Sequence, residues 1–242
     1  MTYLFGLHER VAVVTGGRGR LGSVWCRALM DAGCHVLPLD LPEYDVRQRA
    51  DMDRAAGIFK GVDVLVLAAG IDTPPAAQTW ELNMSFGPRM TELAPTTIGV
   101  FAVNVLGAIT TLEAFLPVLR PKASIIFVGS LYGSVSPDPS LYSHLGFDKP
   151  PSYGASKAAV ASLARHYAVR LASQGIRVNT LSPGGVRGDQ DEEFQRRYAS
   201  HVPLGRMADV DDLIGPLLFL ASDASRYVTG HELRVDGGFT AL

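Results

Sequence analysis

The 242-residue sequence has few cysteines, no marked excess of charge and no uninterrupted apolar run of bilayer-spanning length. Its two cysteines, Cys26 and Cys34, form no CxxC motif or Cys/His cluster, so neither a disulfide framework nor a metal site is indicated. A net charge of -2, from 22 basic and 24 acidic residues, supplies no basic stripe for nucleic acid. These absences predict a protein of the reducing cytoplasm that does not bind nucleic acid.

The N-terminal segment also lacks the features of a targeting sequence. MTYLFGLHER has no basic stretch followed by an apolar run, so we expect a chain that is neither secreted nor embedded in a membrane. Hydrophobic residues make up 47% of the sequence, enough to bury a core without disulfides. Its length suits one α/β domain over residues 1–242.

Short β-branched runs alternate with longer segments of helical period. This alternation predicts a doubly wound, mostly parallel sheet with helices on both faces, which is a Rossmann-type fold. The expected strands cover 11–15, 35–39, 64–68, 124–128, 177–180 and 232–235, and the expected helices cover 21–32, 97–119, 153–173 and 209–221. Three segments, 72–95, 134–151 and 184–202, are expected to be loops that shape a substrate pocket at the carboxyl edge of the sheet.

A glycine-rich turn follows the first expected strand. Gly16 and Gly19 allow backbone amides to approach a phosphate, and Gly22 lets the next helix pack closely on the sheet. A tight strand-to-helix turn without a ligand would look the same. The position of Asp40 at the end of the second strand favours a dinucleotide site.

Asp40 also bears on the choice of cofactor. Its carboxylate suits the two ribose hydroxyls of NAD and would repel the 2'-phosphate of NADP. Alternatively, Asp40 caps the turn at Pro42 and Arg18 pairs with a 2'-phosphate. We therefore expect NAD, with NADP as the alternative.

Tyr153 and Lys157 lie four residues apart at the start of an expected helix, which places both on one face. A neighbouring ammonium lowers the pKa of a phenol from its usual value of about 10. An exposed surface pair is the alternative reading. Ser130, directly after a strand, and Asn104, inside an apolar helix, belong at the same edge of the sheet and favour a catalytic site.

Taken together, these motifs make the chain resemble the short-chain dehydrogenase/reductase family, in its compact single-domain branch, over nearly the full length. The resemblance implies a seven-stranded sheet and a homotetramer. It also implies that Tyr153 is the general acid/base, that Ser130 binds the substrate oxygen, that Lys157 binds the nicotinamide ribose and that Asn104 holds a water. The segments that carry the resemblance are Thr15 to Gly22, Ala68-Ala69-Gly70, Asn104, Ser130, Tyr153-x-x-x-Lys157, Ser182-Pro183-Gly184 and residues 228–238.

The same resemblance implies which residues contact the cofactor. Asp45 and Val46 match the adenine contact, although the helix that normally separates them from Asp40 is missing. The full implied set is Gly16, Arg18, Gly19, Leu21, Asp40, Asp45, Val46, Ala68, Ala69, Gly70, Tyr153, Lys157, Pro183, Gly184 and Val186.

The sequence departs from the family pattern in several places. Arg20 replaces a glycine of the phosphate turn, and Ala68 and Ala69 replace asparagines that brace the central strands. Gly188 replaces a threonine that contacts the nicotinamide carboxamide, a role that Asp189 or Gln190 could take. The segment between Ser130 and Tyr153 is long and holds Asp138, Tyr142, His144 and Asp148, which are candidates to line a polar pocket. Of these, His144 is read as a solvated loop residue rather than as a substrate contact.

The sequence thus predicts reversible hydride transfer between NAD and a secondary alcohol/ketone pair. The polar loops favour a sugar, polyol or cyclitol-like small molecule. One alternative is an NADP-dependent ketoreductase of secondary metabolism, and another is a catalytically silent dinucleotide sensor or scaffold.

Overall fold

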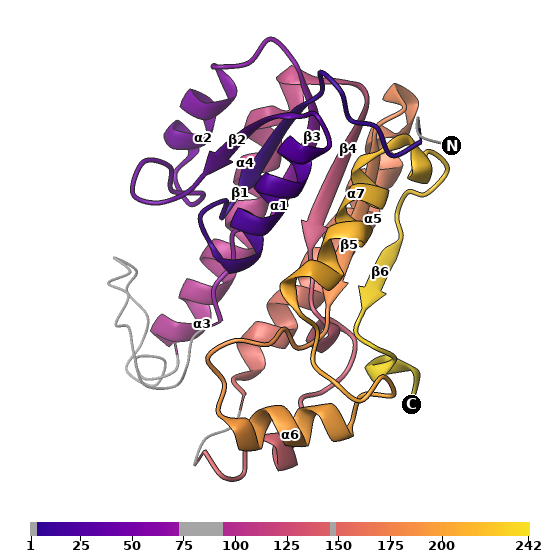
Figure 1. Ribbon diagram of the computed structural model, residues 1–242. Helices are drawn as coiled ribbons and strands as arrows, with labels where there is room; N and C mark the ends of the chain where they lie inside the picture. The colour runs from indigo at the N-terminus through magenta and orange to yellow at the C-terminus, as the bar shows by residue number, and fades with distance from the viewer. Residues whose placement is uncertain (1–3, 73–93, 146–148) are drawn as a thin grey trace.

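The computed structural model describes residues 4–72, 94–145 and 149–242 and has a parallel sheet at its centre (Figure 1). The strands lie in the order β2-β1-β3-β4-β5-β6, and every neighbouring pair is parallel. Their bounds are β1 Val11–Thr15, β2 His35–Leu39, β3 Val62–Leu67, β4 Leu119–Val128, β5 Arg177–Pro183 and β6 Glu232–Val235. All six expected strands are therefore present, and the Rossmann-type fold is confirmed.

The expectation of a seventh strand is wrong for the part of the chain that the structure describes. A further strand beyond β2 would need two crossover connections before β3, and a parallel crossover takes about a dozen residues or more. Residues 40–61 hold only turns and the helix α2, Arg49–Ala56. The chain therefore returns directly to β3, and β2 remains an edge strand.

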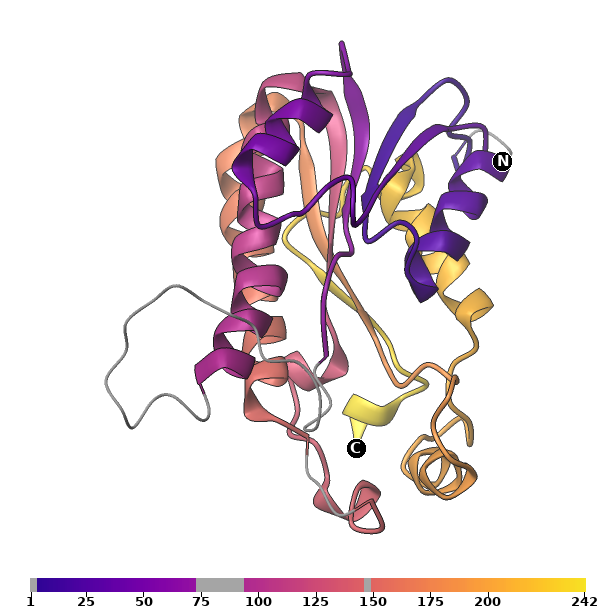
Figure 2. The ribbon, with the colours of Figure 1, turned by 90° about the vertical axis from the view of Figure 1, so that its left-hand side faces the viewer.

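Helices cover both faces of the sheet (Figure 2). The helices α1, Arg20–Asp31, and α7, Ile214–Ala221, pack on one face over a core that includes Trp25 and Leu217. On the other face lie α2, α4 and α5, with Phe115 and Val160 in their core. Further helical bounds are α3 Ala94–Phe101, α4 Ala108–Phe115, α5 Pro151–Leu171 and α6 Glu192–Ser200.

The loop expected over 184–202 is partly wrong, because it contains α6. Asp191 caps this helix by accepting a hydrogen bond from the Phe194 amide, and Phe194 and Tyr198 bury one face of it. The segment 134–145 is irregular apart from one 3-10 turn, Pro139–Leu141, as expected. Most of the loop expected at 72–95 lies outside the described residues.

The helix expected over 97–119 is interrupted. It runs from α3 through a π-helical turn, Ala102–Gly107, into α4 and a 3-10 turn, Leu116–Val118. Within the described residues this run, Thr97–Val118, is the one that is long and apolar enough by composition to cross a membrane. Val103, Leu112 and Phe115 bury part of it against the sheet, as in the core helix of a globular domain. The other 3-10 turns are Leu131–Gly133, Ala172–Gln174, Val210–Leu213, Asp223–Ser225 and Phe239–Ala241.

Candidate active site

A cavity of about 530 Å³ opens at the carboxyl edge of the sheet. The carboxyl ends of β1, β3, β4 and β5 meet there, as in other open α/β sheets that bind ligands. Fifteen of the predicted site residues line it, whereas Arg18 and Asn104 do not. The fifteen are Gly16, Gly19, Leu21, Asp40, Asp45, Val46, Ala68, Ala69, Gly70, Ser130, Tyr153, Lys157, Pro183, Gly184 and Val186.

The glycine-rich turn is packed too tightly for side chains. Gly16 has a φ of +66°, and a Cβ there would lie 2.9 Å from the Cα of Ala69. A Cβ on Gly22 would lie 2.0 Å from the carbonyl oxygen of Gly16. The Thr15 hydroxyl accepts hydrogen bonds from the amides of Ala68 and Ala69 at 3.1 Å, so it braces the strand ends where the family pattern has asparagines.

Asp40 and Arg18 both form hydrogen bonds or ion pairs with residues near them in sequence or space. The Asp40 carboxylate accepts hydrogen bonds from the amides of Arg18 and Leu41, both at 2.8 Å. The Arg18 guanidinium pairs with Glu43 at 2.6 Å and lowers the pKa of that carboxyl. Asp40 lines the cavity, whereas the Arg18 guanidinium is turned toward Glu43 and Arg18 does not line it.

Asp45 and Val46 border the cavity on the side of β2. The Asp45 carboxylate forms an ion pair with Arg47 at 2.6 Å, which lowers its pKa. Val46 is buried, and a Cβ on Gly107 would lie 2.6 Å from its Cγ2. The missing helix thus leaves a compact loop packed on the π-helical turn.

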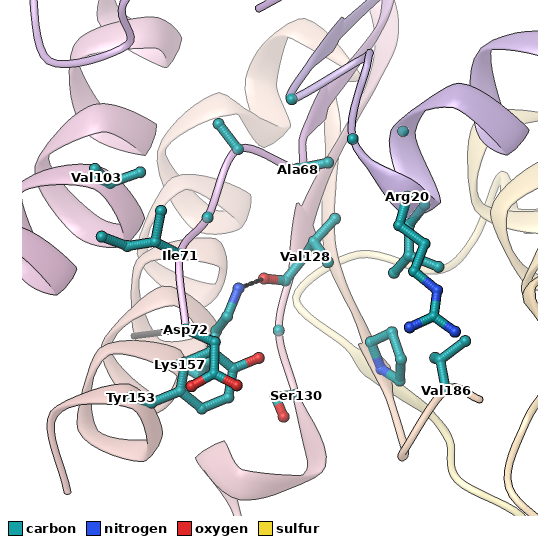
Figure 3. Close-up of a pocket in the computed structure, with 18 of the residues that line it drawn as sticks. Arg20, Ala68, Ile71, Asp72, Val103, Val128, Ser130, Tyr153, Lys157 and Val186 are labelled. Atoms are coloured by element: carbon teal, nitrogen blue, oxygen red, sulfur yellow. Dashed lines mark hydrogen bonds between the residues drawn. The ribbon is translucent and has the colours of Figure 1, made fainter. Parts of the chain in front are cut away.

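Tyr153, Lys157 and Ser130 come together below the ends of β3 and β4 (Figure 3). The Lys157 ammonium lies 5.7 Å from the centroid of the Tyr153 ring and donates a hydrogen bond to the Val128 carbonyl at 2.8 Å. Ser130 is buried just after β4, and its hydroxyl accepts a hydrogen bond from the Tyr132 amide at 3.3 Å. The expected convergence of these three side chains is therefore present.

The pKa of Tyr153 differs from the sequence expectation. Burial and the nearby Asp72 carboxylate raise the pKa, the Ser130 hydroxyl lowers it, and together they bring the pKa of Tyr153 to about 12. Burial also lowers the pKa of Lys157 to about 8. Because burial is the largest cause and it raises the pKa of Tyr153, the expected fall in the tyrosine pKa is wrong for the protein alone.

Asn104 sits in the π-helical turn and holds the chain beyond β3. Its Oδ1 accepts a hydrogen bond from the Ile71 amide at 2.8 Å, and its Nδ2 donates to the Ile71 carbonyl at 3.1 Å. Nδ2 also donates to Ser156 Oγ at 3.0 Å, and Ser156 donates to the Tyr153 carbonyl. The sequence analysis missed Ser156, which connects Asn104 to the helix of Tyr153.

Arg20, the departure in the phosphate turn, crosses the cavity. Figure 3 shows its side chain extending from the start of α1 toward Val186. A Cβ on Gly188 would lie 1.9 Å from one of its guanidinium nitrogens, so only glycine fits there without displacing the arginine. The substitution of a glycine by Arg20 therefore adds a cation at the N-terminus of α1.

Gln190 occupies the segment after β5 where the family pattern has a carboxamide contact. Its Nε2 donates to the Val186 carbonyl at 3.1 Å. Its Oε1 is buried at the cavity and has no hydrogen-bond partner within the described ranges. Of the two candidates, Gln190 lines the cavity and Asp189 does not.

His144 is paired, contrary to its reading as a solvated loop residue. Its Nε2 lies 3.0 Å from Asp191 Oδ1, and His201 Nε2 lies 3.2 Å from Asp138 Oδ2. These two pairs join the 134–145 segment to the two ends of α6. Tyr142 lines the cavity, and Asp148 lies outside the described residues.

The free energy of unfolding of the wild type is expected to rise between pH 7 and pH 10 because of Lys157. Replacing Lys157 with methionine should remove this rise. The pKa of Lys157 is 10.5 in the unfolded reference and about 8 when folded, so the buried ammonium costs stability below pH 8. That cost is relieved as the pH approaches 10.5. The stability of Lys157→Met relative to wild type should therefore fall by about 2–3 kcal/mol between pH 7 and pH 10.

Urea unfolding at the two pH values checks this expectation. Lys60→Met, which alters an exposed lysine, is the control and should show no such change. A pH-independent difference between Lys157→Met and wild type would contradict the account.

Comparisons with known proteins match this geometry. A family model described as "Enoyl-(Acyl carrier protein) reductase" matches residues 13–240. The cis-4-hydroxycyclohexanecarboxylate dehydrogenase of Sinomonas cyclohexanicum is 32% identical, over 97% of this chain and 98% of that protein. The galactitol 2-dehydrogenase (L-tagatose-forming) of Cereibacter sphaeroides is 31% identical, over 98% of this chain and 97% of that protein.

Two solved structures share the fold at full length. A short-chain dehydrogenase from Leptospira borgpetersenii with bound NAD+ has a TM-score of 0.81 and 26% identity, over 97% of this chain and 94% of the other. A gluconate 5-dehydrogenase from Burkholderia cenocepacia in complex with NADP and tartrate has a TM-score of 0.79 and 25% identity, over 100% and 99%. The chain belongs to the short-chain dehydrogenase/reductase family. It is an oxidoreductase that acts on a secondary alcohol or ketone with a nicotinamide cofactor.

Proposed function

We propose that this enzyme uses NAD to interconvert a secondary alcohol and a ketone on a sugar, polyol or cyclitol-like substrate. The observation that carries the proposal is the convergence of Tyr153, Lys157 and Ser130 in one cavity at the carboxyl edge of the sheet. The related dehydrogenases of hydroxycyclohexanecarboxylate and galactitol support the substrate class. The same convergence argues against a catalytically silent sensor.

In the proposed mechanism, Ser130 and Tyr153 act on the reacting hydroxyl, and Lys157 supports Tyr153. Ser130 donates a hydrogen bond to the substrate oxygen, and Tyr153 removes the hydroxyl proton during oxidation. Lys157 holds the nicotinamide ribose and favours the phenolate by its charge. Oxidised nicotinamide, when bound, would bring a further positive charge that favours the phenolate.

The residues that line the cavity are suited to hold a dinucleotide. Gly16 and Gly19 would present amides to the pyrophosphate beside Leu21, and Arg20 adds a cation there. A Cβ on Gly70 would meet Asn104 Oδ1 at 3.3 Å and Lys157 Nζ at 3.4 Å, so the glycine keeps the floor of the cavity open. The cofactor would supply the hydride acceptor. The other proposed contacts are Asp40, Asp45, Val46, Ala68, Ala69, Pro183, Gly184 and Val186, without the Arg18 side chain, which is paired with Glu43.

The proposed preference for NAD rests on Asp40 and Arg18. The carboxylate lines the cavity, and the guanidinium that could bind a 2'-phosphate is paired with Glu43. We expect wild type to favour NAD, and Asp40→Ser to lower the ratio of kcat/KM for NAD over NADP by about tenfold or more, because a repulsive charge is removed. Glu43→Gln should move the ratio in the same direction by freeing Arg18.

The cofactor preference is checked with both cofactors on one alcohol, and by the affinity of each reduced cofactor from its fluorescence. Asp53→Asn, an exposed carboxylate on α2, is the matched control. A wild-type preference for NADP would favour the alternative, a ketoreductase of secondary metabolism.

We further propose a single catalytic domain over residues 1–242 in a cytoplasmic homotetramer. We also propose that Asn104 holds a relay water at its Oδ1, because its two Nδ2 protons are already donated to Ile71 and Ser156. Ala155 and Ala158 are exposed on α5 and offer small side chains for close packing between subunits.

A further inference from the structure

Two oppositely charged side chains meet beside the catalytic tyrosine, and none of the predicted roles includes them. Asp72 follows β3 by a few residues, and Lys149 precedes α5. Their carboxylate and ammonium form an ion pair, and both side chains line the cavity. Figure 3 shows Asp72 close to Tyr153 and Lys157.

The pair lies next to the Tyr153 ring and is partly shielded from solvent. The Lys149 ammonium is 4.9 Å from the centroid of the Tyr153 ring and 6.0 Å from that of Tyr132. The Lys149 side chain is 17% exposed and that of Asp72 is 40% exposed, so solvent reaches the pair only in part. Asn104 fixes the Ile71 backbone by two hydrogen bonds and thereby positions the neighbouring Asp72. A substrate whose hydroxyl reaches Tyr153 would therefore lie close to this pair.

The chemistry of the pair selects what it can bind. A substrate carboxylate that accepts a free Lys149 proton would lie beside the Asp72 carboxylate, which repels it, and a substrate amine beside Asp72 would be repelled by Lys149. Either ion therefore adds a like-charge contact in a site that solvent reaches only in part. A hydroxyl both donates and accepts, so it can donate to Asp72 and accept from Lys149 without breaking the pair.

We propose that Asp72 and Lys149 form a subsite for a second hydroxyl, one or two carbons from the reacting carbinol, which makes a diol or polyol the preferred substrate. This inference rests on the proposed function and narrows its substrate class. Asp72 accepts from the second hydroxyl, and a free Lys149 proton bonds to its oxygen. The alternative is that the ion pair only links the segment after β3 to the segment before α5. Such a role would contribute little, because partly exposed ion pairs add little to stability.

The test uses three matched substrates with wild type, Asp72→Asn, Lys149→Met and the control Asp53→Asn. The substrates are cyclohexanol, 1,2-cyclohexanediol and 2-hydroxycyclohexanecarboxylate, and the readout is kcat/KM from reduced cofactor. The ratio of diol to monoalcohol is the decisive quantity. It cancels any change in the basicity of Tyr153 that follows from altering Asp72, because that change acts on both alcohols.

Wild type should prefer the diol. Asp72→Asn and Lys149→Met should each lower the ratio of kcat/KM for diol over monoalcohol by about tenfold or more, because a hydrogen bond to a charged group is lost. Asp53→Asn should leave it unchanged. Equal losses on diol and monoalcohol would overturn the subsite while leaving the proposed function intact. A wild-type preference for the carboxylate that Lys149→Met abolishes would replace the hydroxyl subsite with an anion site. No oxidation of any of the three by wild type with either cofactor would contradict the proposed function itself.

Discussion

Tyr153→Phe is expected to lower kcat by about 10²–10⁴-fold while leaving the affinity for reduced cofactor within a few-fold of wild type. The substitution removes only the hydroxyl that exchanges the substrate proton. The ring remains, so its contacts with Lys157 and Lys149 persist. Activity is followed by reduced-nicotinamide absorbance, and cofactor affinity by fluorescence titration.

Tyr167→Phe is the matched control for this loss, because it removes a phenol from the same helix outside the cavity. It packs on Phe127 with ring centroids 6.5 Å apart and should retain wild-type turnover. If Tyr153→Phe retained most of the activity, another group would have to carry the proton. If both variants lost activity equally, the effect would belong to the fold of α5.

Gly22→Ala is expected to destabilise the protein by about 1–3 kcal/mol and to weaken cofactor binding. The added Cβ would lie 2.0 Å from the Gly16 carbonyl oxygen and 2.9 Å from the Gly17 Cα. Both neighbours are backbone atoms of the phosphate turn, so the turn or the start of α1 must shift. Urea unfolding gives the stability, and fluorescence titration gives the affinity for reduced cofactor.

Gly215→Ala serves as the control for this steric argument. Gly215 also lies in a helix, α7, but a Cβ there would meet nothing within 4 Å. Alanine should leave the stability unchanged or raise it by up to about 1 kcal/mol, because it reduces the conformational entropy of the unfolded chain. Equal destabilisation by the two variants would show that the packing around Gly22 is not the cause.

Local patterns were enough to predict the sheet and the central side chains of the site. The central strands β1 and β3 and the end of β4 are mostly apolar runs that the sheet buries, and β5 is buried as well, whereas the edge strands β2 and β6 are only partly buried. The Tyr153/Lys157 spacing is fixed by one helix. Ser130 follows from the end of β4 in the same way. These features depend on residues that are close in sequence, so they can be predicted without a structure.

The features that were missed depend on distant segments or on weaker signals. Asp72 and Lys149 carry no motif, and only the folded chain brings them together beside Tyr153. The helix α6 did have a readable signal, since Asp191 is followed by two glutamates and by Phe194 and Tyr198 at helical spacing. The raised pKa of Tyr153 could not be anticipated because burial is a property of the fold.

The most direct test of the central claim is the transfer of deuterium. The enzyme is given NADH deuterated at the transferring carbon together with ribulose, tagatose or a hydroxylated cyclohexanone, and the products are read by mass spectrometry. The account predicts that deuterium appears on the new carbinol carbon, with loss of that transfer in Tyr153→Phe. Consumption of the cofactor without deuterium at that carbon, or its appearance at a reduced carbon–carbon double bond, would contradict it.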